Sequence, residues 1–166
     1  MLALFDLDNT LIDRSAGLEH WARCFVRARS LPREAATVIC DRLRERAHPG
    51  DFVGLRAVLG LSDGPRDLWH AYVDGVARSV RCFPGARDGL DALRGAGWTI
   101  GLATNGAGDV QRAKLAATGL APLFDGICVS LGRGTGTEAG APSLRGCGGG
   151  VRRVTQCWWV DGRRQP

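Results

Sequence analysis

Four apolar residues, 2–5, stop at Asp6, and a second carboxylate follows at Asp8. A short unbroken apolar run is typical of a buried strand in a parallel sheet, because such strands are covered on both faces. Two carboxylates so close together repel each other by about 4 kcal/mol at roughly 4 Å and an effective dielectric near 20. One interpretation is a solvated turn that caps a helix, a position that Asp favours. We favour a functional loop, in which a cation or a proton relieves the repulsion.

A helical pattern begins after Asp13 and continues to about residue 81. Apolar residues recur at positions i, i+3, i+4, i+7 and i+8 from Leu18 to Val26, which predicts an amphipathic helix. Three more segments of helical periodicity follow, and the last of them ends before Phe83 and Pro84. Four helices in a row between strands predict an inserted helical unit.

After Pro84 the pattern alternates between helix and strand. We expect a helix from Ala86, a strand at 98–103, a helix at 108–118 and a strand at 126–130. Such alternation predicts an α/β fold with a parallel sheet that helices cover.

Composition changes near Leu131. Of the net charge of +5, residues 1–130 carry only +1, whereas residues 131–166 carry six Arg against two acidic residues and hold 9 of the 24 glycines. The basicity therefore belongs to a Gly/Arg-rich tail and does not form a groove, which argues against a nucleic-acid-binding protein. Binding of nucleic acid by the tail alone is the remaining alternative, and it predicts steep salt dependence and loss on truncation at Ser130.

No apolar run reaches the roughly 18 residues that a membrane span needs, and Met1 leads into residues 2–5 without a basic leader. We therefore expect a cytoplasmic protein with no membrane partner. The six cysteines form no CxxC pair, which predicts reduced thiols and no structural zinc site. The three histidines are expected to face solvent or to be satisfied within the fold, and they lie in the helical segment at His20, His48 and His70.

The Asp-rich loop resembles the first motif of the haloacid dehalogenase-like (HAD) hydrolases, which reads DxDxT followed by an apolar residue. Asp6, Asp8, Thr10 and Leu11 match it position by position. Residues 100–106 resemble the second motif, an apolar strand that ends in Ser or Thr. Dehalogenases of the superfamily usually lack an acid at the position of Asp8, so the chain is more similar to the phosphatases, in particular to phosphoglycolate phosphatase-like proteins.

This resemblance implies a Rossmann-like core with a C1-type helical cap. The core comprises residues 1–13 and 82–130, the cap is residues 14–81, and residues 131–166 are an atypical tail that leaves the core incomplete at its C-terminal end.

The resemblance also assigns roles to four residues. Asp6 is the nucleophile that forms an aspartyl-phosphate, and Asp8 is the acid and base. Thr104 and Asn105 bind the phosphoryl group of a small phosphorylated substrate. Mg²⁺ lies on the Asp6 carboxylate and the Asp8 backbone carbonyl. The resemblance indicates no particular oligomeric state.

Two family motifs are not intact in this chain. The third is a Lys, commonly before Pro, and Lys114 comes too early for it; we expect Lys114 to be a surface residue. The fourth is a Gly-Asp after an apolar strand, and residues 157–161 resemble it with the order changed, which makes Asp161 a candidate metal ligand. Loss of one such electrostatic stabiliser typically costs about 10² to 10³ in rate. The alternative function is a non-catalytic remnant that binds phosphate or a partner.

The break in composition motivates the hypothesis that the tail is a frameshifted reading of a normal gene. If residues 138–142 are encoded GAA GCC GGC GCC CC, an advance of one base gives Lys-Pro-Ala-Pro, which is the missing third motif. Sequencing of the coding DNA across codons 128–166 tests this hypothesis. It predicts poor packing over 131–155, with amides less protected than those of residues 98–104. A tail unable to supply the next strand would also leave residues 2–5 as an exposed edge.

Overall fold

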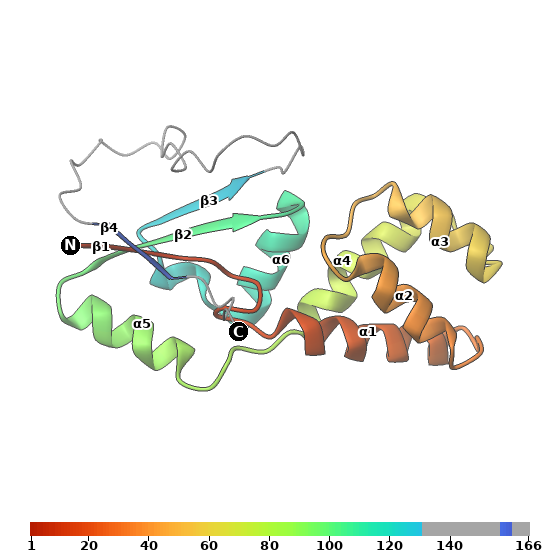
Figure 1. The fold of residues 1–166 in the computed structure, drawn as a ribbon, viewed down its shortest axis with the longest axis horizontal. Coiled ribbons are helices and arrows are strands. Elements are labelled where there is room, and N and C mark those ends of the chain that lie inside the picture. The colour runs from red at the N-terminus through yellow and green to blue at the C-terminus, as the bar shows by residue number, and fades with distance from the viewer. Residues whose placement is uncertain (131–156, 161–166) are drawn as a thin grey trace. The chain divides into compact units, whose positions relative to one another are not determined.

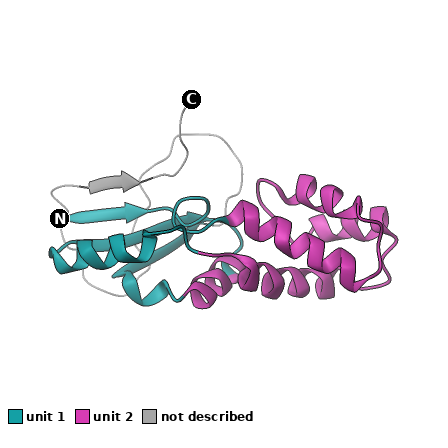
Figure 2. Cartoon of the chain, turned by 90° about the horizontal axis from the view of Figure 1, so that it is seen from below, with its two compact units in different colours: residues 1–13, 82–108, 119–166 teal, residues 14–81, 109–118 magenta. Residues whose placement is uncertain are grey.

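The computed structural model describes residues 1–130 and the strand at 157–160. The chain divides into two compact units (Figure 2). The first unit consists of Met1–Asp13, Cys82–Gly108 and Gly119–Pro166, and the second consists of Arg14–Arg81 and Asp109–Thr118. The predicted core includes residues 109–118. In the structure these residues are instead grouped with the helices of the second unit.

The first unit is built on a parallel sheet with the strand order β3-β2-β1-β4 (Figure 1). Its strands are β1 (Leu2–Phe5), β2 (Thr99–Asn105), β3 (Gly126–Ser130) and β4 (Cys157–Val160). All four residues of β1 are buried, as the apolar run predicts for a strand inside a parallel sheet. The predicted α/β class and the parallel sheet are therefore confirmed.

The register of the two central strands fixes which residues meet at the carboxyl edge of the sheet. Phe5 pairs with Leu102, so that Asp6 directly follows β1 while Thr104 lies near the end of the neighbouring strand β2. Close packing at this junction requires a glycine: a Cβ on Gly101 would lie 2.5 Å from the Leu4 Cδ2 atom. The second strand pair places Asn105 opposite Ser130.

Strand β4 occupies the outer side of β1, with Leu2 paired to Cys157 and Phe5 to Val160. The tail therefore supplies the strand beside β1, so the condition under which we expected an exposed edge is not met. The physical reason is that residues 157–160, Cys-Trp-Trp-Val, form a short apolar run of strand-forming residues that can pair with it. Asp161 and the predicted poor packing of 131–155 lie outside the described residues.

Helix α5 (Ala86–Gly95) and the short 3₁₀ helix η1 (Ala121–Leu123) complete the described part of the first unit. The Arg94 guanidinium donates to the Leu123 carbonyl at 2.8 Å, and the Asp125 carboxylate accepts from the Ile100 backbone N–H at 2.7 Å. These contacts connect the helix, the 3₁₀ turn and the start of β2. They fix the strand that carries Thr104.

The second unit contains the four predicted helices of the insertion, α1 (Arg14–Ala28), α2 (Ala35–Leu43), α3 (Asp51–Leu59) and α4 (Pro65–Ser79), together with most of α6 (Gly108–Thr118). Helix α1 packs against α2 and α4, and α3 packs against α4. Aromatic rings fill the interior: the ring centroids of Trp21 and Tyr72 are 5.0 Å apart in an edge-to-face arrangement. The apolar faces of these helices thus pack against one another within the second unit.

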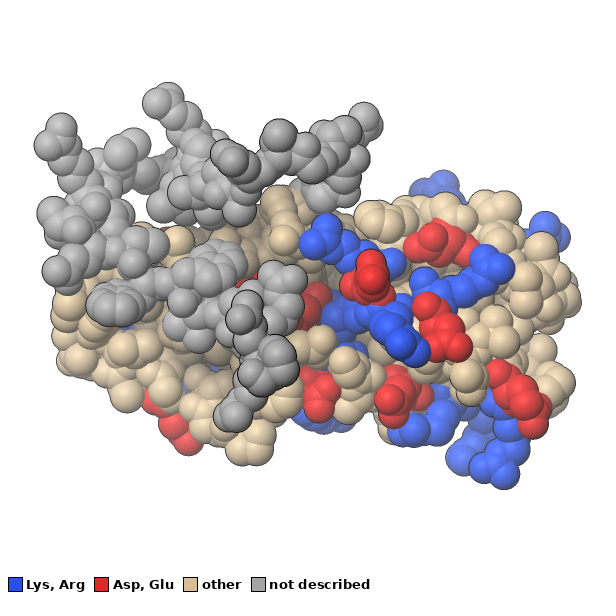
Figure 3. Space-filling model, in the orientation of Figure 1, with Lys and Arg blue, Asp and Glu red and all other residues tan. Residues whose placement is uncertain are grey.

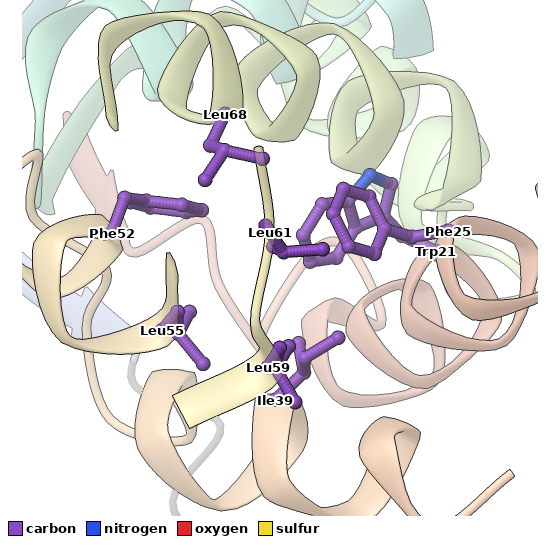
Figure 4. Close-up of a pocket in the computed structure, with 8 residues that line it drawn as sticks. All are labelled: Trp21, Phe25, Ile39, Phe52, Leu55, Leu59, Leu61 and Leu68. Carbon is purple, nitrogen blue, oxygen red and sulfur yellow. The ribbon is translucent and has the colours of Figure 1, made fainter. Parts of the chain in front are cut away.

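A small pocket lies among these helices (Figure 4). Only apolar and aromatic residues line it: Trp21, Phe25, Ile39, Phe52, Leu55, Leu59, Leu61 and Leu68. Such a lining holds no cation or phosphate, because it offers no charged group or array of hydrogen-bond donors. The pocket is therefore part of the packing and is not a candidate active site. Among the residues described, no helix is both long and apolar enough to cross a membrane.

Candidate active site

The Asp-rich loop is a tight turn anchored by its apolar residues. The backbone N–H groups of Leu11 and Ile12 donate to the Leu7 carbonyl at 3.0 and 3.1 Å, and all three side chains are buried. Asn9 has a φ of 59°, in the left-handed region that Asn tolerates better than most residues. These backbone hydrogen bonds and buried side chains hold the shape of the turn.

Asp6 and Asp8 are half-buried, whereas the apolar residue between them is fully buried. The difference follows from side-chain chemistry, because the apolar Leu7 is packed inside the turn whereas the carboxylates keep contact with solvent. The chain leaves the first unit after Asp13 and re-enters at Cys82, where Ile12 and Cys82 form an antiparallel bridge. The loop is thus held at both ends, by β1 and by the returning chain.

The end of β2 presents the second pair of predicted site residues. Thr104 is buried, with 3% of its surface exposed, and Asn105 is exposed. The Ser130 hydroxyl donates to the Asn105 side-chain oxygen, and the Gly106 backbone N–H donates to the Ser130 carbonyl at 3.2 Å. The end of β3 therefore fixes both the Asn105 amide and the loop that follows it.

Parallel pairing brings these two segments to the same edge of the sheet. In Figure 1 the loop after β1 and the loop after β2 leave the sheet at the carboxyl ends of their strands. Ligands of open α/β sheets bind at this edge. The structure therefore gathers Asp6, Asp8, Thr104 and Asn105 in one region of the first unit.

The donor chemistry of this region fits Mg²⁺. In the described part of the chain no group of three or more His, Cys, Asp or Glu side chains is placed to hold a metal ion. Mg²⁺ does not need such a group, because proteins usually hold it with one or two carboxylates, and phosphate oxygens and water supply the remaining ligands. Asp6 can provide such a carboxylate, and the backbone carbonyl of Asp8 can provide a further oxygen.

Two buried polar residues of α6 were not predicted. Gln111 and Lys114 are each only 1% exposed, so the expectation that Lys114 is a surface residue is wrong. The physical reason is its place on the helix: it lies one turn after Val110 and next to Leu115, both of which are buried. The spacing of Val110 and Leu115 is the signal in the sequence that could have identified the buried face of α6.

Charge is mixed on the visible face of the helical unit (Figure 3). Basic and acidic side chains are interspersed there. Within the described part of this unit, opposite charges are also paired one helical turn apart, as in Arg23–Glu19 at 3.7 Å and Arg44–Asp41 at 2.7 Å. Nucleic acid selects a continuous basic surface. The described residues on the face in Figure 3 form no such continuous surface.

A parallel sheet that carries an Asp pair after its first strand, with a helical insertion directly after that loop, defines a Rossmann-like hydrolase core. The family model of haloacid dehalogenase-like hydrolases matches residues 1–143, and the chain belongs to this family.

Solved structures share the fold at low sequence identity. One is assigned as a beta-phosphoglucomutase from Thermotoga maritima (TM-score 0.61, 17% identity, 77% of this chain and 60% of that one). Another, from Bacillus subtilis, is assigned as the HAD-hydrolase YfnB and is bound to magnesium. Its TM-score is 0.59 at 22% identity, over 78% of this chain and 64% of that one. A third is a predicted phosphoglycolate phosphatase from Haemophilus somnus, with a TM-score of 0.51 at 18% identity, over 77% of this chain and 61% of that one. The chain thus spans less than two thirds of each of these proteins. No curated protein sequence matches it.

Proposed function

We propose that this HAD-family chain hydrolyses a small phosphate ester through an aspartyl-phosphate on Asp6. The observation that carries the proposal is the pair of half-buried carboxylates at the end of β1, at the same sheet edge as the buried Thr104. The acid at position 8 favours a phosphatase over a dehalogenase, because transfer from an ester requires a proton for the leaving oxygen.

The two carboxylates have different tasks. The Asp6 carboxylate attacks phosphorus as the bond from phosphorus to the ester oxygen breaks, and the Asp8 carboxyl gives its proton to that oxygen. Asp8, now ionised, takes a proton from water as the water oxygen attacks the phosphorus of the aspartyl-phosphate. The bond from phosphorus to Asp6 then breaks, and inorganic phosphate leaves with both side chains restored.

Thr104 and Asn105 stabilise the transferring group. A hydroxyl and an amide N–H fixed at the sheet edge donate to phosphoryl oxygens, where negative charge develops. The hydrogen bond from Ser130 to the Asn105 side-chain oxygen supports this role, because it orients the amide before substrate binds.

Mg²⁺ would be held by the Asp6 carboxylate and the Asp8 backbone carbonyl. When bound, the ion neutralises charge on the phosphoryl oxygens and lowers the repulsion between the phosphoryl group and the nucleophile. Residues 14–81 would serve as the C1-type cap, and the substrate would resemble those of phosphoglycolate phosphatase-like enzymes.

The second candidate is a remnant that binds phosphate, or a partner, without turnover. The lack of an intact third or fourth family motif favours it, because the motif lysine would stabilise both the nucleophile and the phosphate. Slow turnover is accordingly expected even if the chain is an enzyme.

Hydrolysis of p-nitrophenyl phosphate by the full chain separates the two candidates. The enzyme predicts turnover that requires Mg²⁺, stops with a chelator and falls at least about 10³-fold in Asp6→Asn, as loss of a nucleophile does. Asp91→Asn, on the exposed face of α5, is the matched control and should leave turnover unchanged. Calorimetric binding of inorganic phosphate without turnover identifies the remnant. Metal-independent turnover, or full activity of Asp6→Asn, contradicts the proposed chemistry.

A further inference from the structure

A nitrogen and a sulfur donor lie side by side on α1. His20 and Cys24 are one helical turn apart, both are exposed, and the His20 Nε2 and Cys24 Sγ atoms are 3.6 Å from each other. Residues at positions i and i+4 share one face of a helix, so the backbone itself holds the two donors together. Neither residue has a part in the chemistry proposed for Asp6.

The spacing of the two donors matches that of a shared metal ion. Zinc binds Cys sulfur at about 2.3 Å and His nitrogen at about 2.0–2.1 Å in tetrahedral geometry. A tetrahedral angle between bonds of these lengths separates sulfur from nitrogen by about 3.6 Å. The two donor atoms, which are hydrogen-bonded to each other, therefore already lie at the separation that one shared ion requires.

Donor type selects which metal binds. Thiolate and imidazole favour Zn²⁺ and similar borderline-soft ions, whereas Mg²⁺ prefers oxygen ligands. The neighbouring Arg23 is paired with Glu19 at 3.7 Å, which reduces the positive charge that an arriving cation meets. The helix thus offers a site that excludes Mg²⁺.

We propose that His20 and Cys24 form an exchangeable binding site for a borderline-soft divalent cation such as Zn²⁺. Structural zinc sites use four protein ligands, but no third His, Cys, Asp or Glu joins this pair among the described residues. Water completes the coordination, so the ion exchanges with solvent. The site is independent of the proposed hydrolysis and stands whether or not the chain is an enzyme.

Co²⁺ added to the metal-free, reduced full chain tests the proposal, with Zn²⁺ as competitor. We expect a thiolate-to-cobalt absorption band that Zn²⁺ abolishes and that excess Mg²⁺ leaves unchanged. Affinity should fall at least ten-fold in both Cys24→Ser and His20→Gln. The matched controls, Cys40→Ser on α2 and His70→Gln on α4, should bind as the parent does. Circular dichroism of the four variants verifies that each is folded.

Alkylation provides a second, residue-specific readout. Zn²⁺ should slow the reaction of Cys24 with iodoacetamide several-fold, measured by peptide mass spectrometry, and this protection should disappear in His20→Gln. Cys40 serves as the internal reference, and its own reaction is slow because burial, followed by the nearby Glu19 charge, raises its pKa. No cobalt band in the parent, unchanged affinity in both variants, or equal protection of Cys24 in His20→Gln would overturn the proposal.

Discussion

At the scale of single residues, the Thr104 hydroxyl is the group whose removal separates binding of the phosphoryl group from folding. Thr104→Val keeps the side chain's shape at a site that is 3% exposed but removes its hydrogen-bond donor. We expect kcat to fall by about 10² to 10³, with a loss of stability of about 1 to 2 kcal/mol. Thr104→Ser, which retains the hydroxyl, should recover most of kcat. Steady-state kinetics and urea unfolding measure both effects, and equal activity of the Val and Ser variants would exclude the assigned role.

The Arg29–Asp63 pair gives a pH-dependent contribution to stability. Arg29 donates to Asp63 at 2.9 Å, and this hydrogen bond lowers the pKa of the Asp63 carboxyl below its usual 3.8. Because the folded-state pKa is the lower one, the stabilisation is present above pH 3.8 and is lost as pH falls through the folded-state pKa. The side chains are 27% and 33% exposed, so the pair is worth less than about 1 kcal/mol. Urea unfolding of the parent and Asp63→Asn should differ by this amount at pH 7 and converge in acid; a difference independent of pH would contradict the assignment.

The positions of the four candidate site residues could be predicted because each follows an apolar run that forms a strand. Asp6 and Thr104 need only the rule that parallel strands end at one edge of a sheet. Burial of Lys114 could not be predicted with the same ease, because a lysine is mostly exposed and the packing around α6 involves residues distant in the chain. The hydrogen bond from the Trp69 indole N–H to Asp109 at 2.7 Å is non-local in the same way.

At the scale of elements, α1 and α4 approach closely because each contributes a glycine. A Cβ on Gly17 would lie 2.6 Å from the Val80 Cγ1 atom, and one on Gly75 would collide with the Trp21 ring. Gly75→Ala should therefore destabilise the protein by about 1 to 3 kcal/mol, in spite of alanine's higher helix propensity. Gly89→Ala, on α5 with no atom within 4 Å, should stabilise it by about 0.5 to 1 kcal/mol. Thermal unfolding compares the two, and stabilisation in both variants would show that the close approach is not required.

The four helices of the insertion could be predicted because their apolar periodicity is local to each segment. The pairing partner of β1 could not be predicted from periodicity, since it lies more than 150 residues away in the chain; only the resemblance of residues 157–161 to the fourth family motif indicated it. The same apolar run that identified β1 as buried gave no information on which segment would cover its outer side.

At the scale of the whole molecule, β4 protects the edge of β1. A chain that ends at Ser130 lacks β4 and exposes the backbone N–H and C=O groups of an apolar strand, which promotes aggregation. We expect a lower Tm and concentration-dependent association of this truncated chain relative to the full chain. Light scattering and size-exclusion chromatography detect the association. A monomeric truncated chain with unchanged Tm would show that β4 contributes nothing to the sheet.

The proposed hydrolysis requires that Asp6 receives a phosphoryl group. Acid quenching of the full chain during reaction with p-nitrophenyl phosphate and Mg²⁺, followed by peptide mass spectrometry, tests it directly because an aspartyl-phosphate is preserved in acid. We expect a mass increase of one phosphoryl group on the peptide that contains Asp6. The increase should be larger in Asp8→Asn, which hydrolyses the intermediate slowly, and absent in Asp6→Asn. Turnover with no modified peptide in either the parent or Asp8→Asn, or a phosphoryl group on another residue, would contradict it.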